Sequence, residues 1–493
     1  MSPSLSTSPT SAATTIINSN SLQLPATKCP LVQPITKCTV LPDRKSTQSD
    51  LKLSVSDLPM LSCYYIQKGL FFPPPHIPIH RLFSLLTRSL SRALSFFPGL
   101  AGKLTTNPDD GRIFISCNDV GVEFIHAAAP SLSLQLLLRP SHDVPMEVQS
   151  LFALNGAVSY DGHFRPLAAF QFTELGDGAV FIGCTANHAV VDGTSFWNFF
   201  NAWAELCRSP ATTTISRPPD LRRNFFGDST AVILFPGGAG PEVTFSVGAP
   251  LRERIFSFTN AAVRELKSRA NRWERDNAEL YGKRIHDKKL IAEGEEISSF
   301  QSLCAQMWRS VTRARKHLRP EALTTFRMAV NCRHRIFPPI DKFYFGNAIQ
   351  SLPTTAKVGD VAESELWWAA ELLHRNVAAH WDEKIRKGVA DWETAPRCFP
   401  LGNPDGAGIT MGSSPRFPMY EGNDFGWGGP VAVRSGKANK FDGKFSAFPG
   451  RYGGGSVDIE VCLAPETMAA LLEDEEFMYY VSKGFEGEAV DAK

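Results

Sequence analysis

The sequence predicts a mixed α/β protein with two domains, on three observations. Its 493 residues exceed the usual size of one domain. Helical and strand-like periodicities alternate in both halves of the chain. A stretch rich in proline, threonine and glycine, residues 208–250, separates the halves and is typical of a long irregular connection. We therefore expect domains at 31–207 and 251–493, with a segment around 380–415 packing with the first.

The first residues of the chain predict no packed element. Residues 1–42 contain no Asp or Glu, and the first twenty are rich in Ser and Thr without any Arg. Plastid transit peptides usually carry Arg. We therefore expect a disordered tail over 1–30 and a cytoplasmic protein, with a transit peptide and a plastid location as the alternative.

The first half of the chain alternates a few helices with several strands. Ser56–Pro59 has the pattern of a helix cap or turn, and 63–66 is strand-like. Residues 79–97 repeat apolar side chains at helical spacing until Pro98-Gly99 ends the helix. Strands are expected at 112–117, 122–125 and 180–187.

In the second half, helices are expected at 261–271 and 298–315. The second of these has an apolar stripe and a basic last turn, which suits the helix dipole. The densely charged residues 272–296 predict a solvated helix face or loop. A glycine-rich region over 402–455 interrupts any long helix.

Composition excludes several classes of function. The formal net charge is +1, so there is no electrostatic footprint for nucleic acid. No apolar run reaches the roughly 18–20 residues that span a bilayer. The ten cysteines are scattered without C-x-x-C or zinc spacing, which predicts reduced thiols and no metal. We expect a monomer without a bound cofactor.

His188 and Asp192 are the principal candidates for chemistry. They occupy the one H-x-x-x-D stretch of the chain, between a predicted buried strand and a helix expected to begin after Gly193. An imidazole with a pKa near 6.5 can take and return a proton within one turnover. On spacing alone, a structural histidine at a strand end remains the alternative, with Asp192 pointing inward to fix the turn.

A second conspicuous segment is Asn423-Asp424-Phe425-Gly426-Trp427-Gly428-Gly429-Pro430. Aromatic residues and an acid between glycines need a tightly turned backbone that still plants large rings in a core. The segment lacks the context of a nucleotide-binding loop. It therefore predicts a structural loop, with Asp424, Gly426 and Gly428 shaping the turn.

Together, H-A-V-V-D-G at 188–193 and D-F-G-W-G at 424–428 resemble the plant BAHD acyltransferases, which use acyl-CoA thioesters. The resemblance spans about residues 30–480. Four shorter segments also resemble segments of the family and occur in the same order along the chain: Ser91–Leu104, Leu303–Arg315, Val330–Pro338 and Phe345-Gly346-Asn347.

This resemblance implies two α/β domains of chloramphenicol-acetyltransferase type, joined by a crossover loop over 208–250, with the active-site channel between them. His188 would be the general base, deprotonating an alcohol or amine acceptor that attacks the acyl-CoA donor. Asp192 would be a structural partner paired with an arginine, Arg333 ahead of Arg335. Trp427 is a candidate oxyanion donor, although core packing is favoured for it.

The sequence departs from the family pattern at two places. Gly429 stands where many relatives have a basic residue, and Arg434 is the candidate that would compensate at a CoA phosphate. The segment Gly412–Arg416 lacks the Trp of many relatives, so the acceptor class stays open; Ser413 and Ser414 are candidate hydrogen-bond donors there. Two alternatives remain: the same fold with lyase or intramolecular acyl-transfer chemistry, or a non-catalytic binding protein.

Overall fold

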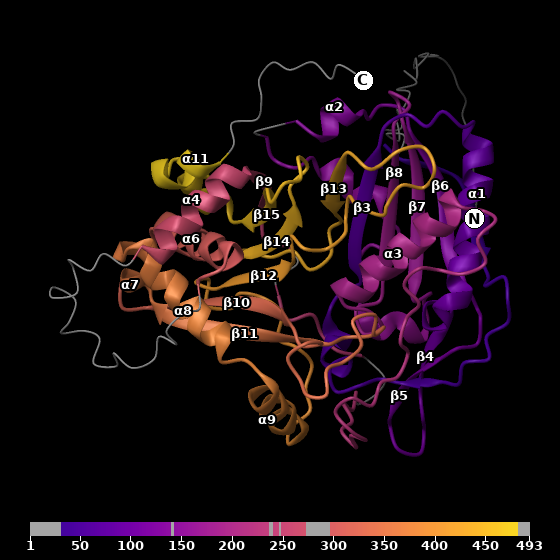
Figure 1. Ribbon diagram of the computed structural model, residues 1–493, viewed down its shortest axis with the longest axis horizontal. Coiled ribbons are helices and arrows are strands. Elements are labelled where there is room, and N and C mark those ends of the chain that lie inside the picture. The colour runs from indigo at the N-terminus through magenta and orange to yellow at the C-terminus, as the bar shows by residue number, and fades with distance from the viewer. Residues whose placement is uncertain (1–30, 140–141, 236–239, 246–247, 273–295, 482–493) are drawn as a thin grey trace, which may run out of the picture.

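The computed structural model describes residues 31–139, 142–235, 240–245, 248–272 and 296–481. Two six-stranded sheets, one largely from each half of the chain, stand side by side (Figure 1). The tail predicted at 1–30 and nearly all of the charged segment 272–296 lie outside the described residues. Within the described part, no helix combines the length and apolar character that crossing a membrane requires.

The first sheet is completed by a strand from the second half of the chain. Its order is β1 (Gln33–Val40), β6 (Val122–Ala129), β7 (Ala168–Leu175), β8 (Val180–Ala186), β3 (Ile66–Phe72) and β13 (Ala432–Ser435). All neighbours are antiparallel except β6 and β7. Because β13 pairs with β3, the two halves of the chain share one hydrogen-bonded sheet.

Two amphipathic helices pack with the first sheet, α1 (Ile79–Phe96) and α3 (Gly193–Arg208). Both were predicted, and their apolar stripes are buried in one core with the sheet. Trp203 of α3 donates its indole N–H to Leu86 O and Ser89 Oγ of α1, each at 3.1 Å. Smaller elements are β2 (Leu51–Lys52), β4 (Lys103–Thr106), β5 (Ile113–Ser116), α2 (Leu134–Leu137) and the 3-10 helices η1 (Leu58–Ser62), η2 (Pro98–Ala101), η3 (Met146–Leu151) and η4 (Ser159–His163).

The second sheet has the order β11 (Ile349–Lys357), β10 (Leu323–Asn331), β12 (Ile409–Ser413), β14 (Lys444–Pro449), β15 (Val457–Leu463) and β9 (Arg252–Phe258). Helices α4 (Asn260–Asn271), α6 (Ser299–Ala314) and α8 (Leu366–Ala378) cover its outer side, away from the first sheet (Figure 1). The others are α7 (Val358–Glu363), α9 (Asp382–Glu393), α10 (Pro465–Leu472) and α11 (Glu475–Tyr480).

The strands of the second sheet alternate between an apolar and a polar face. Phe445, Ala447 and Ile459 are buried among the covering helices. Their neighbours Lys444 and Glu460 point to the other face, where they border a cavity. Successive side chains of a strand point to opposite faces, so this alternation gives the cavity a charged floor.

One local prediction in the first half is wrong, and another is confirmed. The strand expected at 63–66 instead runs over Ile66–Phe72, because β3 lies between β8 and β13 and its apolar run is buried on both faces. The cap or turn expected at Ser56–Pro59 forms as a turn at 55–57 that leads directly into η1. Asp57 precedes η1 but makes no capping bond, because its carboxylate is committed elsewhere.

After the last residue of α3, Arg208, the described residues of the connection over 208–250 form no helix or strand and make only an isolated bridge between Asp220 and Tyr344. Further along, Phe399 N donates to Pro59 O at 2.8 Å, so this part of the 380–415 segment touches the first half. Through these two contacts, the irregular segments around Asp220 and Phe399 each connect one half of the chain to the other.

Candidate active site

A cavity of about 1210 Å³ lies between the two sheets. His188 borders it from the first half, and Ser413, Ser414 and Lys444 border it from the second. Pockets for one drug-sized molecule are typically about 300–1,000 Å³. The space is therefore sufficient for two reactants that meet near His188.

His188 lies in the turn between β8 and α3, and its backbone is held on both sides. His188 N donates to Ser159 Oγ at 3.1 Å, and Asn347 Nδ2 donates to His188 O at 2.8 Å. The ring Nδ1 is enclosed and has no hydrogen-bond partner in the part of the chain that the structure describes. This leaves Nε2 as the ring nitrogen that can meet a molecule in the cavity.

The turn also depends on a glycine at the start of α3. A Cβ on Gly193 would lie 2.7 Å from the Phe417 ring, which itself borders the cavity. A Cβ atom essentially never lies this close to another heavy atom, so a side chain at position 193 would force the Phe417 ring to move. Gly193 thus allows the cavity wall from the second half to pack directly against the His188 turn.

Burial lowers the pKa of His188 below its usual 6.5. The backbone carbonyl of His188 and the carboxylate of Asp192 oppose this shift, while the nearby Lys444 ammonium reinforces it. An imidazole with a lowered pKa is neutral at pH 7, and a neutral imidazole is the form that accepts a proton.

Asp192 is fully buried and caps α3. Its Oδ1 accepts from Ser195 N at 2.9 Å, and its Oδ2 accepts from Ala348 N at 3.1 Å. Arg333 donates to both oxygens, at 2.7 and 3.1 Å. Although burial by itself raises the pKa of Asp192, the Arg333 guanidinium and these N–H donors outweigh it and hold the pKa below its usual range.

Arg333 is the partner of Asp192, and Arg335 is not. Arg333 Nη2 also donates to Tyr344 O at 3.0 Å and to Gly346 O at 3.1 Å. Arg335 instead donates to Val377 O and His380 O, each at 2.9 Å. One arginine thus fixes Asp192 to the loop between β10 and β11, while the other fixes the end of α8.

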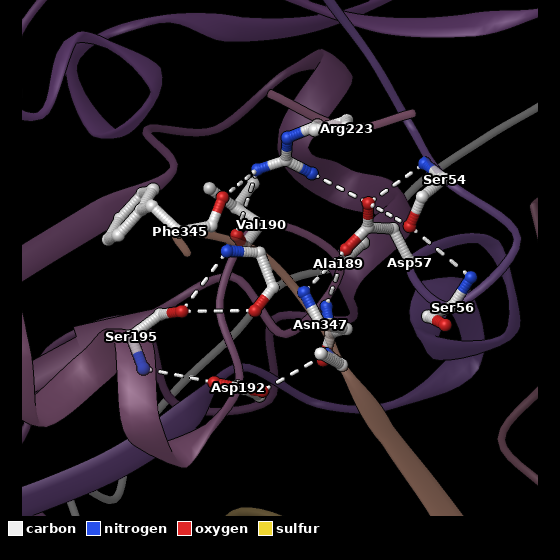
Figure 2. A network of polar contacts seen from close by, with 12 residues as sticks. Ser54, Ser56, Asp57, Ala189, Val190, Asp192, Ser195, Arg223, Phe345 and Asn347 are labelled. Atoms are coloured by element: carbon white, nitrogen blue, oxygen red, sulfur yellow. Dashed lines mark hydrogen bonds and ion pairs between the residues drawn. The ribbon is translucent and has the colours of Figure 1, made fainter. Parts of the chain in front are cut away.

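A second buried ion pair, between Asp57 and Arg223, lies next to Val190 of the turn that follows β8 (Figure 2). Asp57 Oδ2 accepts from Arg223 Nη1 at 2.7 Å, and Asp57 Oδ1 accepts from Asn347 N and Nδ2 at 2.8 and 2.9 Å. Arg223 Nη2 donates further to Val190 O at 3.2 Å. Because Asn347 also holds His188 O, this network fixes the histidine turn in addition to the contacts made by Asp192.

No sequence pattern predicted a role at the site for Asp57, Arg223 or Asn347. Of the three, only Asp57 could have been noticed in the sequence, because it stands among the apolar residues Leu53, Val55 and Leu58. All three are buried in the structure. A carboxylate among buried apolar residues needs a partner. Nothing in the sequence indicates which arginine, because Arg223 lies 166 residues away within an irregular connection.

Of the two candidate serines, Ser413 has the more available hydroxyl. Its Oγ is buried and has no hydrogen-bond partner among the described residues, although Ser413 borders the cavity. Its φ of +66° lies in the left-handed region, which a residue with a side chain seldom adopts. Ser414 Oγ already accepts from Arg416 N at 3.2 Å.

The glycine–aromatic segment lies outside the cavity lining. Asp424 Oδ1 accepts from Gly426 N at 2.7 Å and from Gly428 N at 3.0 Å, which closes the turn. Both glycines have φ near +115°. Trp427 is buried with its ring 5.3 Å from that of Phe72, and no described residue accepts a hydrogen bond from its indole N–H. The geometry therefore brings Trp427 into the core rather than to His188.

Arg434 also lies away from the cavity lining. It belongs to β13, its Nη1 donates to Val433 O at 2.8 Å, and its Nε is buried without a partner. Burial lowers the pKa of its guanidinium. Among the described residues, no group of His, Cys, Asp and Glu is arranged to hold a metal ion.

The fold and the cavity define a two-domain α/β protein of chloramphenicol-acetyltransferase type, as the resemblance predicted. Vinorine synthase is 20% identical with a TM-score of 0.68, over 92% of this chain and 98% of that one. TRI101 of F. sporotrichioides, solved with coenzyme A and T-2, is 21% identical with a TM-score of 0.69, over 88% of this chain and 99% of that one.

Comparison of sequences gives the family. The Transferase family matches residues 31–478. BAHD acyltransferase DCR of Arabidopsis thaliana is 34% identical, over 86% of this chain and 88% of that protein. An uncharacterized acetyltransferase of Arabidopsis thaliana is also 34% identical, over 87% and 94%. The chain belongs to the Transferase family, the family of the plant BAHD acyltransferases.

Proposed function

We propose that the protein transfers an acyl group from a CoA thioester to a hydroxyl or amine of a small molecule, with His188 as the general base. The observation that carries the proposal is the position of His188, which borders a cavity large enough for two reactants while burial keeps its ring neutral. Relatives named acyltransferases and a fold neighbour solved with coenzyme A support the same chemistry.

In this reaction, both substrates are held together and no covalent enzyme intermediate is needed. His188 takes the proton of the acceptor O–H or N–H as that atom attacks the thioester carbonyl carbon. The new bond converts the carbonyl oxygen into an oxyanion. When the C–S bond breaks, the electron pair leaves on sulfur, and His188 returns its proton to the thiolate.

The oxyanion needs a hydrogen-bond donor that is already in place. Ser413 fits this role because its hydroxyl is unpartnered, borders the cavity and has no competing bond to satisfy. Asp192 and Arg333 act at a distance from the reacting atoms, since they hold the turn that carries His188. We assign them as positioning residues.

Release of free thiol tests the proposal. Purified protein is incubated with acyl-CoAs in the presence and absence of alcohols and amines, and the free CoA thiol is followed. We expect release that requires an acceptor and falls by at least about 1,000-fold in His188→Ala. Acceptor turnover without CoA would indicate a lyase or intramolecular reaction, and full activity in His188→Ala would refute the mechanism.

His163→Ala provides the matched control for the loss of an imidazole. His163 bonds to Thr106 and to Tyr160 O in η4, and it does not border the cavity. This variant should keep thiol release close to that of the original protein.

A further inference from the structure

The cavity has a strongly uneven charge. Of the residues that the structure describes, seven lysine and arginine side chains border it, against a single carboxylate, Glu460. Cations near the entrance, such as the exposed Lys342, suit the phosphates of CoA. A different explanation is needed for the lysines on the floor of the cavity, between the two sheets.

Most charges on this floor already have partners. Lys440 Nζ lies 2.5 Å from Glu253 Oε1 and 3.8 Å from Glu460 Oε1, so it balances the carboxylates of β9 and β15. Lys68 Nζ, from β3, donates to Ser435 Oγ at 2.5 Å. The two glutamates are thus tied mainly to Lys440.

Lys444 is the exception. It stands at the start of β14 and borders the cavity, yet within the described part of the chain no carboxylate lies within 4 Å of its Nζ. Its ammonium lies close against Gly412, where an added Cβ would collide with Nζ. Gly412 precedes Ser413, and Lys444 also acts electrostatically on the His188 ring. The ammonium is therefore near the proposed reaction centre.

An unpaired cation in this position is costly. Burial, reinforced by the neighbouring Lys68 ammonium, lowers the pKa of Lys444 to about 8, although the Glu460 carboxylate opposes the shift. A buried ammonium without a counter-charge is destabilising unless an anion joins it. CoA phosphates do not meet this need, because the pantetheine arm separates them from the thioester carbonyl.

We propose that Lys444, assisted by Lys68, forms a subsite for a carboxylate carried by one of the two substrates. The carboxylate is either the free end of a dicarboxylic acyl group or an acid group on the acceptor. The subsite narrows the substrate class and rests on the proposed function, because it assumes that the cavity holds an acyl donor and an acceptor.

Binding measurements test the subsite without requiring turnover. Calorimetry at pH 7 measures two pairs of ligands. The donor pair, or donor arm of the experiment, is malonyl-CoA and acetyl-CoA. The acceptor pair, or acceptor arm, is 3-hydroxybenzoate and its methyl ester. We expect the acid to bind at least about tenfold more tightly than its neutral partner in one arm, which identifies the source of the carboxylate. Lys444→Met should weaken binding of that acid by about 30- to 100-fold and leave its neutral partner within about threefold.

Two further variants control this result. Lys437→Met removes an exposed charge from the same segment outside the cavity and should change neither ligand. If Lys444→Met fails to fold, Gly412→Ala displaces the ammonium without removing it and should abolish the preference for the acid in the same way.

Equal binding of acid and neutral partners in both arms would overturn the subsite. So would a Lys444→Met variant that weakens all ligands alike, which would limit Lys444 to tuning the His188 turn. The proposed function fails separately: preference for the acid without acceptor-dependent thiol release refutes acyl transfer but not the subsite. Thiol release without any preference refutes only the subsite.

Discussion

Arg333 binds both carboxylate oxygens of Asp192, at 2.7 and 3.1 Å, across 141 residues of chain. Asp192 caps α3 beside the first sheet, and Arg333 follows β10 of the second. The pair therefore joins the two halves of the chain at the turn that carries His188. The position of the histidine thus depends on contact between the halves.

Removing the Asp192 charge should destabilise the whole protein. Asp192→Asn leaves Arg333 buried without its counter-charge, a change that costs about 3–5 kcal/mol. Thermal denaturation at pH 7 should show a clear fall in melting temperature together with lost thiol release. Glu371→Gln, which breaks a partly exposed i,i+4 pair with Arg375, should cost only about 0.5 kcal/mol.

The same pair has a defined pH dependence. The pKa of Asp192 is lowered in the folded protein, so its contribution is complete above the unfolded value of 3.8 and is lost as pH falls through the folded value. The stability gap between the original protein and Asp192→Asn should thus be constant near pH 7 and narrow below pH 3.8. Unchanged stability in Asp192→Asn with lost activity would indicate a direct chemical role instead.

The rate should report the lowered pKa of His188. Because burial disfavours the imidazolium, the ring stays neutral to below pH 6.5, and the acid limb of kcat/KM should lie under that value. Lys444→Met removes a charge that lowers this pKa, so the limb should move to higher pH. Lys437→Met should leave it in place, and a limb above pH 6.5 in the original protein would contradict the assignment.

Asn347 connects the second ion pair to the histidine. Asn347→Ala removes the side-chain amide that donates to His188 O and to Asp57 Oδ1. The backbone N–H bond to Asp57 survives this change, so the stability loss should be about 1–3 kcal/mol. A looser turn should lower kcat by about 10- to 100-fold with KM within about threefold. Asn403→Ala, which loses bonds to Asp442 and Gly408 outside the cavity, should lower stability without this fall in kcat.

Ser413 allows stability and activity to be separated. Ser413→Gly relieves a left-handed backbone, worth roughly 1 kcal/mol, and so should raise or maintain the melting temperature. Loss of the hydroxyl should nevertheless lower kcat by about 100-fold. Ser414→Gly removes a hydroxyl that bonds Arg416 N and should affect stability more than rate. If both variants keep full kcat, neither serine stabilises the oxyanion.

Much of the local structure follows from short-range patterns. The strand before His188 and the helices at α1, α3, α4 and α6 are marked by side-chain periodicity and by their ends, such as Pro98 after α1. The His188–Asp192 motif and the glycine–aromatic turn were also visible, because tight turns demand particular residues at fixed spacing. The strand at β3 was misplaced, since burial on both faces removes the alternation that defines a strand.

The sequence by itself determined the two α/β halves, the histidine at a strand–helix junction and, by resemblance, the family. Only the tertiary structure decided which arginine pairs with Asp192, that Asp57 and Asn347 support the His188 turn, and that Lys444 stands unpaired on the cavity floor. These relationships join residues more than a hundred positions apart, and their energies depend on burial. Neither the partner nor the burial of a charged side chain is encoded in its immediate neighbours, so both appear only when the two sheets come together.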